Sequence, residues 1–454
     1  MKTSIVVLTM LIQLGSYAED GPGLALTNLQ PFPNTNGAAG TLVLGINPGD
    51  PVDTTGAFFR NFGSNKRTCF TCHAPSSGWT VTPQSAQDLF QSSSGLDPLF
   101  RTNDGSNAPE LDVSTLEAKR KAYSMLLSRG VIRVGLPIPA NAEFTLAAVD
   151  DPYHHASASD LSLFRRPLPS QNLAFLSDVM WDGRETALPT DITTDLGNQA
   201  NDATKTHAAT TVDLQQADED EMVQFEQTLF FAQLTSSTAG SLTDGGALGG
   251  PEELSKQNFY LGMNDPLGRD PKGTAFDPTV FATFRAWQNV STGNQAEARS
   301  SVARGEELFN HRSFSISGVA GLNDVAGKAT IQGTCTTCHN TPNVGGNSST
   351  MRMNIGVSDE SQRTADLPLY TLKNIQTGAI LKTTDPGRAL ISGKWADIGS
   401  FKIPSLRGLS GRAPYFHNGS AKTIEEVISY LNQRFQMGLS VAETSDLAGF
   451  LKAL

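Results

Sequence analysis

Cysteine is scarce in this sequence, and its placement is informative. The 454-residue chain has four cysteines, and all of them fall within residues 69–73 and 335–339, so none remains for a structural disulfide. Each stretch reads Cys-x-x-Cys-His. A C-x-x-C pair alone would also suit half a zinc site or a thioredoxin-type redox pair. The histidine directly after each pair favours attachment of a c-type haem instead.

The spacing within each stretch explains how such a haem would be held. Two thiols three positions apart can each add to one vinyl group of the porphyrin, and the next histidine can reach the iron as an axial ligand. We therefore expect two covalently bound haem c groups, with His73 and His339 as the proximal iron ligands. The residues expected at the two attachment sites are Cys69, Cys72, His73, Cys335, Cys338 and His339.

Long apolar runs are missing beyond the first residues. A basic Lys2, an apolar run over residues 5–14 and small residues up to Ala18 follow the pattern of a secretory signal peptide. No later stretch of about 18 apolar residues could span a bilayer. We expect residues 1–18 to be a signal peptide, no membrane span in the rest, and a periplasmic location, because c-type haem is attached outside the cytoplasm in bacteria.

Basic residues are outnumbered. The chain carries 34 Lys and Arg against 45 Asp and Glu, a formal net charge of -11. A nucleic-acid surface needs clustered Lys and Arg, so nucleic acid is not expected as a partner. An acidic surface suits a basic redox protein, although many exported proteins are acidic for other reasons. The length indicates two or three domains, and a homodimer is left open.

Several segments show helical or strand patterns. A capping box opens an apolar pattern over residues 114–130, and an apolar stripe predicts a helix over residues 214–234. Two last helices are expected, one capped by residues 423–426 and one over residues 444–454. One small hairpin is also predicted, because two short segments alternate apolar and other residues. Its strands are residues 131–138 and 144–149.

Three further stretches narrow the prediction. Residues 179–185 read Val-Met-Trp-Asp-Gly-Arg-Glu, residues 401–407 read Phe-Lys-Ile-Pro-Ser-Leu-Arg, and residues 413–419 read Ala-Pro-Tyr-Phe-His-Asn-Gly. Together with two C-x-x-C-H stretches in this order, they resemble the bacterial di-haem cytochrome c peroxidase family, which includes the methylamine-utilisation enzyme MauG. The resemblance extends over nearly the whole chain after residue 18.

The resemblance implies a mainly α fold with two cytochrome-c-like helical haem domains, long loops and the minor β-hairpin. The N-terminal, peroxidatic haem domain is expected over residues 19–290, with insertions, and the C-terminal, electron-transfer haem domain over residues 291–454. Trp181 matches a tryptophan between the two haems that relays electrons; a core packing residue is the alternative. Arg407 and His417, in the other two stretches, are expected to bind the haem groups.

Cleavage of a peroxide O–O bond needs a group that moves a proton to the leaving oxygen. The family's Gln-Ala pair falls on residues 199–200, and the acidic position that follows it falls on Ala209. On a helix, Gln199 and His207 would share one face. We expect both at the first haem, with His207 as acid–base catalyst or as sixth iron ligand. A surface His207 is the alternative, and the pair at residues 154–155 is then next in line.

The second haem departs from the family pattern. The usual Met or Tyr ligand falls on Leu431, while Tyr430 and Met437 do not match the position. We therefore expect a second haem without a Met-to-iron charge-transfer band and with a low potential, unless Met437 or one of two other methionines reaches the iron. Those two are Met351 and Met353.

The family's calcium site is doubtful in this chain. Its side-chain ligand positions fall on Arg166 and Arg412, and two cations argue against calcium unless main-chain carbonyls hold the ion. Pairing of the two guanidinium groups with haem propionates is the alternative.

The implied activity is that of an oxidoreductase of the cytochrome c peroxidase type. Electrons from a small cytochrome c or a cupredoxin would pass from the C-terminal haem to the N-terminal haem, where hydrogen peroxide is reduced to water. Two alternatives stay open. One is a MauG-like oxidase or oxygenase acting on an organic or protein substrate, and the other is a non-enzymatic di-haem electron carrier.

Overall fold

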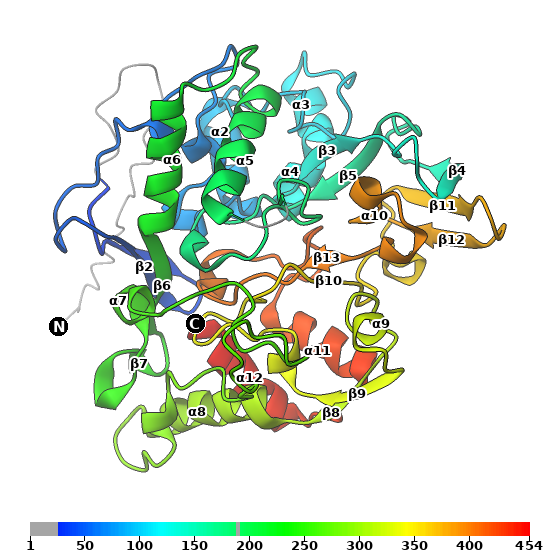
Figure 1. Ribbon diagram of the computed structural model, residues 1–454. Helices are drawn as coiled ribbons and strands as arrows, with labels where there is room; N and C mark the ends of the chain where they lie inside the picture. Colours follow the sequence, from blue (N-terminus) through cyan, green and yellow to red (C-terminus); the bar gives the residue numbers. More distant parts are fainter. Residues whose placement is uncertain (1–25, 188–190) are drawn as a thin grey trace, which may run out of the picture.

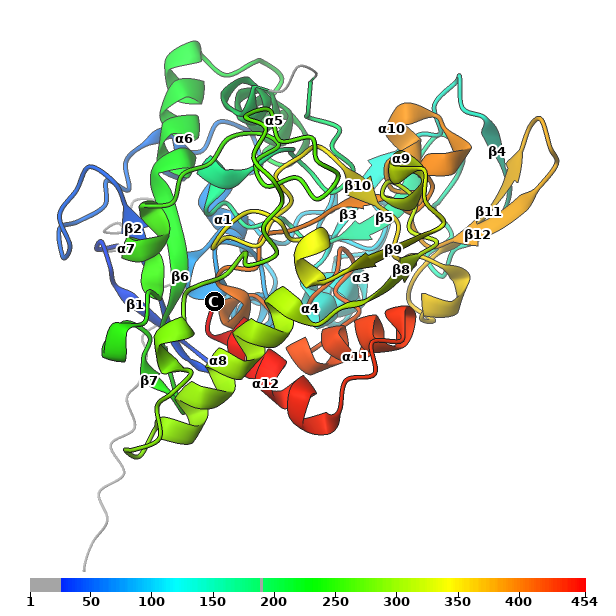
Figure 2. The same cartoon turned by 60° about the horizontal axis from the view of Figure 1, so that its bottom comes forward.

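A computed structural model describes residues 26–187 and 191–454, so the expected signal peptide over residues 1–18 lies outside the described ranges. Helices and strands alternate along the chain and are mixed in space (Figures 1 and 2). The helices are α1 (Cys69–Cys72), α2 (Pro83–Ser93), α3 (Leu116–Ala122), α4 (Ser124–Arg129), α5 (Ile192–Thr206), α6 (Gln216–Thr228), α7 (Gly250–Ser255), α8 (Ala296–His311), α9 (Asn323–Ala326), α10 (Ala389–Ser392), α11 (Ile424–Phe435) and α12 (Val441–Lys452).

Strands are more abundant than the sequence predicted. Within the described residues they form a four-stranded sheet of order β1-β2-β6-β7, a three-stranded sheet of order β12-β11-β4, and three two-stranded ribbons. The prediction of a mainly α fold therefore describes only part of the structure. The strands are β1 (Pro31–Asn34), β2 (Gly37–Val43), β3 (Ile132–Leu136), β4 (Phe144–Asp150), β5 (Leu161–Arg165), β6 (Leu229–Ser236), β7 (Gly240–Ser241), β8 (Phe314–Ser317), β9 (Thr330–Gly333), β10 (Arg352–Met353), β11 (Leu369–Asn374), β12 (Ile380–Thr383) and β13 (Phe401–Lys402).

The predicted helix ends are largely confirmed. Residues 114–130 form α3 and α4, and Gly130 ends α4 in the left-handed conformation, which glycine adopts without steric cost. The cap of α3 is Thr115 rather than its neighbour, because the Thr115 side chain accepts the Ala118 N–H. Thr423 caps α11 as expected. The last helix, α12, begins three residues before the predicted start.

The helix predicted over residues 214–234 is wrong in its last six residues. The chain is helical as α6 up to Thr228 and then becomes β6, which pairs with β2 along seven residues. The first five residues of β6 are all buried. A run buried on every side has no helical or strand period, so its apolar pattern could not distinguish the two structures.

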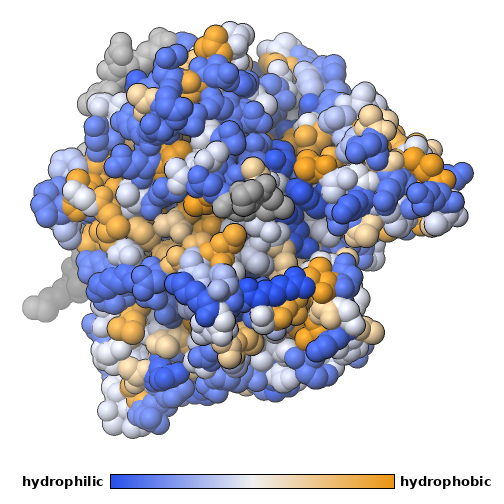
Figure 3. Space-filling model, in the orientation of Figure 1, coloured by the Kyte–Doolittle hydropathy of each residue, from blue (hydrophilic) through white to orange (hydrophobic). Residues whose placement is uncertain are grey.

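The predicted hairpin is also wrong, although both of its strands exist. β3 pairs with β5 and not with β4, while β4 pairs with β11, more than 200 residues further along the chain. The sheet β12-β11-β4 projects from the body of the molecule (Figures 1 and 2). Its hairpin carries exposed Ile375 and Ile380, and hydrophobic residues are visible at this end of the molecule, as they are elsewhere on the same face (Figure 3).

The largest apolar cluster lies under the C-terminal helices. α8 and α12 lie side by side in both views, and Phe281, Phe284 and Trp287 pack with their buried residues. Because residues before 290 share this cluster with α8, α11 and α12, the domain boundary near residue 290 stays a prediction. Among residues 26–187 and 191–454, no helix has both the length and the apolarity needed to cross a membrane.

Candidate haem sites

The two cysteine stretches fold in the same way. In each, a threonine directly before the first cysteine begins a short helical turn, and its N–H donates to the hydroxyl of the threonine three residues later. The N···O distance is 3.0 Å for Thr68 to Thr71 and 3.0 Å for Thr334 to Thr337. This reciprocal cap fixes a single turn that would otherwise be too short to persist. The turn places both cysteines of a pair at the same cavity.

Each histidine is oriented by a carbonyl six residues further on. His73 Nδ1 lies 3.0 Å from the Trp79 carbonyl oxygen, and His339 Nδ1 lies 2.5 Å from that of Gly345. A ring that donates from Nδ1 carries its lone pair on Nε2, the usual arrangement of a metal-ligating histidine. Burial lowers the pKa of both imidazoles to about 4, so both rings are neutral and free to ligate.

The two cysteine stretches line two separate cavities. One is lined by Cys69, Cys72 and His73, and the other by Cys335, Cys338 and His339. The surface of each cavity is mainly apolar. Paired thiols, an oriented imidazole and a mainly apolar space fit a c-type haem in each cavity. We call these the first and second cavities.

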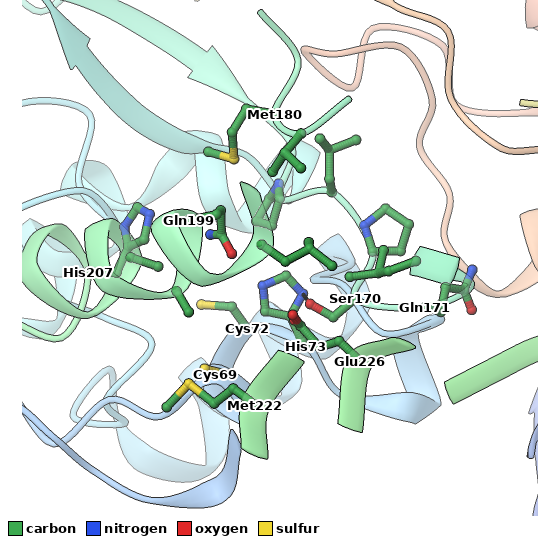
Figure 4. A pocket seen from close by; sticks show the side chains of 18 of the residues that line it. Cys69, Cys72, His73, Ser170, Gln171, Met180, Gln199, His207, Met222 and Glu226 are labelled. Atoms are coloured by element: carbon green, nitrogen blue, oxygen red, sulfur yellow. Dashed lines mark hydrogen bonds between the residues drawn. The ribbon is translucent and has the colours of Figure 1, made fainter. Parts of the chain in front are cut away.

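Helix α5 brings polar groups to the first cavity. Gln199 and His207 both line it, as the expected helical spacing requires, although His207 is the residue that caps α5 and not part of the helix proper. In Figure 4 the amide of Gln199 extends from α5 toward the middle of the cavity, above the imidazole of His73. The end of α5 is held by Asn65 and Asn103, whose amides donate to the carbonyls of His207 and Thr206.

His207 is oriented by a carboxylate that the sequence did not reveal. His207 Nδ1 lies 2.5 Å from Asp104 Oδ2, and Asp104 also forms a buried ion pair with Arg67. Burial would raise the pKa of Asp104, but the charge of Arg67 and the bond from His207 outweigh it and hold this pKa below its usual value. The carboxylate therefore accepts from Nδ1–H, which leaves Nε2 of His207 as the basic nitrogen.

A dividing wall separates the cavities and lines both. Its members include Arg166, Pro167, Trp181, Lys402, Pro404 and Arg412. The Trp181 Nε1–H donates to the Arg166 carbonyl at 2.8 Å, and the Trp181 carbonyl accepts from the Lys402 N–H at 2.9 Å. Hydrogen bonds therefore hold both the side chain and the main chain of Trp181 in place. Trp181 therefore lies between the two cavities.

The second cavity offers several groups in place of the usual ligand. Leu431 lines it, as the sequence position predicted, and so do the buried methionines Met353 and Met437. Tyr430 and Met351 are not among its lining residues; the Tyr430 hydroxyl donates to the Ile355 carbonyl at 2.7 Å. The structure therefore leaves two thioethers within the same cavity as His339.

His417 and Arg407 differ in their placement. His417 lines the second cavity and is 2% exposed, and neither of its ring nitrogens has a hydrogen-bond partner among the described residues. Its ring stacks on Phe401 at 4.1 Å between centroids. His417 Nε2 lies 3.8 Å from Asp385 Oδ2, too far for a hydrogen bond, so both nitrogens of this buried ring could still bond to a group in the cavity. Arg407 lines neither cavity; its Nε donates to the Asn343 carbonyl at 2.6 Å, within the loop that holds His339.

Two further groups at the first cavity were missed by the sequence analysis. Met180 directly precedes Trp181, has a backbone φ of 68° and directs its side chain into the region near Gln199 (Figure 4). Glu226, on α6, is 6% exposed, and burial raises its pKa to about 7. The Ser170 hydroxyl hydrogen-bonds to Glu226 and lies 3.1 Å from His73 Nδ1. Neither Met180 nor Glu226 belongs to a spacing pattern, although Met180 lies within the stretch over residues 179–185.

The histidine pair at residues 154–155 lies outside both cavities. His155 is hydrogen-bonded to Glu110 and Asp160.

Part of the chain is similar in sequence to known proteins. Over 136 residues the chain is 32% identical to the cytochrome-c peroxidase IdrP2 of Denitromonas iodatirespirans, covering 28% of this chain and 37% of that protein. Over 122 residues it is 32% identical to the cytochrome c551 peroxidase of Nitrosomonas europaea, covering 26% and 30%. The chain is related to bacterial cytochrome c peroxidases. The resemblance found from the motifs is thereby confirmed.

The relationship covers part of each protein. The cytochrome-c peroxidase IdrP1 of D. iodatirespirans is 27% identical over 200 residues, which span 40% of this chain and 46% of that protein. The matched segments thus span less than half of these relatives. No family model matches the chain. Among solved structures, a MauG-like protein associated with microbial copper homeostasis is similar at 15% identity and a TM-score of 0.32, over 66% of this chain and 76% of its own.

Proposed function

We propose that this protein is a peroxidase-like di-haem c-type cytochrome that reduces hydrogen peroxide to water in its first cavity. The observation that carries the proposal is the dividing wall: Trp181 lines two cavities, each of which also holds a C-x-x-C-H stretch. A redox-active side chain between two cavities that each carry a haem-attachment stretch favours electron transfer from one to the other. The reaction is H₂O₂ + 2 e⁻ + 2 H⁺ → 2 H₂O.

Haem iron, when bound, supplies the centre at which peroxide is reduced, and the chain's residues supply ligands and proton movement. His73 would be the protein ligand of the iron. His207 Nε2, which lines the same cavity, would take a proton from one oxygen of the peroxide and deliver it to the leaving oxygen. Asp104 keeps the His207 ring in the tautomer that makes Nε2 basic. Gln199 donates from its amide and orients the peroxide.

The second cavity is the entry point for electrons in this proposal. His339 would ligate the second iron, and Trp181, which lines both cavities, would carry electrons through the dividing wall. A small cytochrome c or a cupredoxin is the proposed donor, and the net charge of -11 suits a donor with a basic face. We place the protein in the periplasm, where c-type haem is attached.

The test is a spectrum of the purified protein combined with a haem count. The pyridine haemochrome assay should give two covalent haems per chain, and part of the haem should be high-spin and respond to peroxide. A count of one or none would refute the proposal. Two low-spin haems that ignore peroxide would indicate an electron carrier. Peroxide-driven oxidation of an organic or protein substrate, with no turnover of an electron donor, would indicate a MauG-like oxidase instead.

A further inference from the structure

Two guanidinium groups in the dividing wall lack a carboxylate partner. Arg166 is 5% exposed, and both it and Arg412 line both cavities. Arg166 donates to the carbonyls of Arg129 at 3.1 Å and of Arg412 at 2.9 Å. Arg412 donates to the Ser405 carbonyl, and its Nε has no hydrogen-bond partner among the described residues. Among residues 26–187 and 191–454, neither arginine forms an ion pair with an acidic side chain.

Other buried cations nearby are treated differently by the fold. Arg165, the last residue of β5 and the one directly before Arg166, is paired with Asp182 at 2.5 Å and Asp385 at 2.7 Å. Arg67, at the first cavity, is paired with Asp104. Burying an unpaired charge costs several kcal/mol, so proteins pair such groups or leave them to a ligand. The two guanidinium groups of the dividing wall line both cavities, so negative charge from outside the polypeptide can reach them.

Burial changes the pKa of both guanidinium groups. It lowers the pKa of Arg166 to about 9, with the neighbouring charge of Arg412 adding to the effect, and it lowers the pKa of Arg412 to about 10. Both arginines are still charged at neutral pH, and they lie close enough for their charges to repel. A site with two mutually repelling cations is suited to two anionic groups rather than one.

We propose that Arg166 and Arg412 form one carboxylate clamp that binds propionate groups of both haems across the dividing wall. This inference rests on the proposed function, since it needs a haem in each cavity. Guanidinium groups match carboxylates in shape and charge, and a haem carries its carboxylates on one edge. Because each arginine lines both cavities, the clamp would join the two haems electrostatically through the same two side chains.

The clamp makes a specific prediction about redox potentials. Positive charge beside a haem favours the ferrous form, so removing it should lower the potential. In the holoprotein, Arg166→Gln and Arg412→Gln should each lower the midpoint potentials of both haems in a spectroscopic redox titration without peroxide. Arg166→Lys keeps the charge and should stay near the wild-type values for both.

Arg184 is the matched control. It lines the first cavity only and is already paired with Asp182 at 3.2 Å. Arg184→Gln should change at most the potential of one haem. A shift confined to one haem in the Arg166 and Arg412 variants, or no shift, would overturn the clamp. An equal shift of both haems in Arg184→Gln would overturn it too, since the effect would then not depend on the dividing wall.

A measurement on the wild-type protein separates the two sources of carboxylate. With propionates in the clamp, titration with sodium acetate at constant ionic strength should leave both potentials unchanged. A saturable shift would mean that a free carboxylate occupies the site and would overturn the assignment to propionates. This arm needs no variant to fold. If two haems are present and the clamp variants behave as expected but peroxide is not reduced, only the proposed reaction is wrong.

Discussion

Replacing Asp104 with asparagine tests the proposed distal chemistry most directly. Asp104 is 5% exposed and lies between Arg67, to which it is ion-paired, and His207, whose Nδ1 is 2.5 Å away. Asparagine has nearly the same shape, so the change removes charge and acceptor capacity without opening a cavity. Two separate effects are expected, one on stability and one on proton transfer.

The stability effect comes from Arg67, whose side chain is 3% exposed. Removing one partner of a buried ion pair costs about 3–5 kcal/mol, because the other charge stays buried. Arg67 keeps hydrogen bonds to the carbonyls of Pro98 and Leu99, at 2.8 Å each, which places the expected loss near the lower end, about 3 kcal/mol. That is a large share of the roughly 5–15 kcal/mol by which proteins are stable.

The chemical effect follows from donor and acceptor counting. Arg67 can only donate, so the single oxygen of the introduced amide must face it, and the amide NH₂ must face His207. His207 then accepts at Nδ1 and carries its proton on Nε2. The nitrogen that should take a proton from peroxide becomes a donor. Loss of a positioned base slows such a step by roughly 100-fold or more, while the resting spectrum should change little.

Urea unfolding followed by circular dichroism and stopped-flow mixing with peroxide measure the two effects. Asp366→Asn is the matched control, since it breaks a pair with Arg129 in which the Asp366 side chain is 38% exposed, away from both cavities. Its expected cost is about 1 kcal/mol or less, with a normal peroxide rate. A normal peroxide rate in Asp104→Asn would refute the role of His207 as base, and an unchanged stability would refute the buried pair.

The stability that the Asp104 carboxylate contributes should also depend on pH. The pKa of Asp104 is lower in the folded protein than its usual value of 3.8, so the carboxylate adds stability above that value and loses it as the pH falls through the folded pKa. The stability difference between wild type and Asp104→Asn should therefore be full at neutral pH and shrink only below about pH 4.

Further predictions concern individual residues of the two sites. His207→Ala should slow peroxide cleavage by roughly 100-fold or more with an unchanged spectrum if the ring is a catalyst, whereas a low-spin to high-spin change with faster peroxide binding would make it an iron ligand. Trp181→Phe should keep both haems but lose most interhaem electron transfer in rapid mixing, and normal transfer would make Trp181 a packing residue. Replacing Cys335 and Cys338 with Ala should leave one covalent haem in the pyridine haemochrome assay. The second haem should show no Met-to-iron charge-transfer band. A band that is present in the wild type and disappears in Met437→Leu would contradict the expected low potential and identify Met437 as the ligand.

Local signals in the sequence were sufficient for much of the candidate site. The two T-C-x-T-C-H stretches carry their own caps, so the turn and the attachment geometry are encoded within six residues. Eight residues of helix bring Gln199 and His207 to the same cavity, as the 3.6-residue period requires. The cap at Thr423 likewise needs no information from the rest of the chain. Where a contact is local, the sequence determined it.

Contacts between distant segments were decided only by the tertiary structure. Alternation marks β3 and β4 as strands but does not name their partners, because pairing depends on which edges the rest of the fold leaves free. The burial of β6 on every side likewise hides its period. Asp104 reaches His207 across about 100 residues of chain without a sequence motif. Two adjacent arginines show the same limit: only the three-dimensional structure gives Arg165 two carboxylates and leaves Arg166 to the cavities.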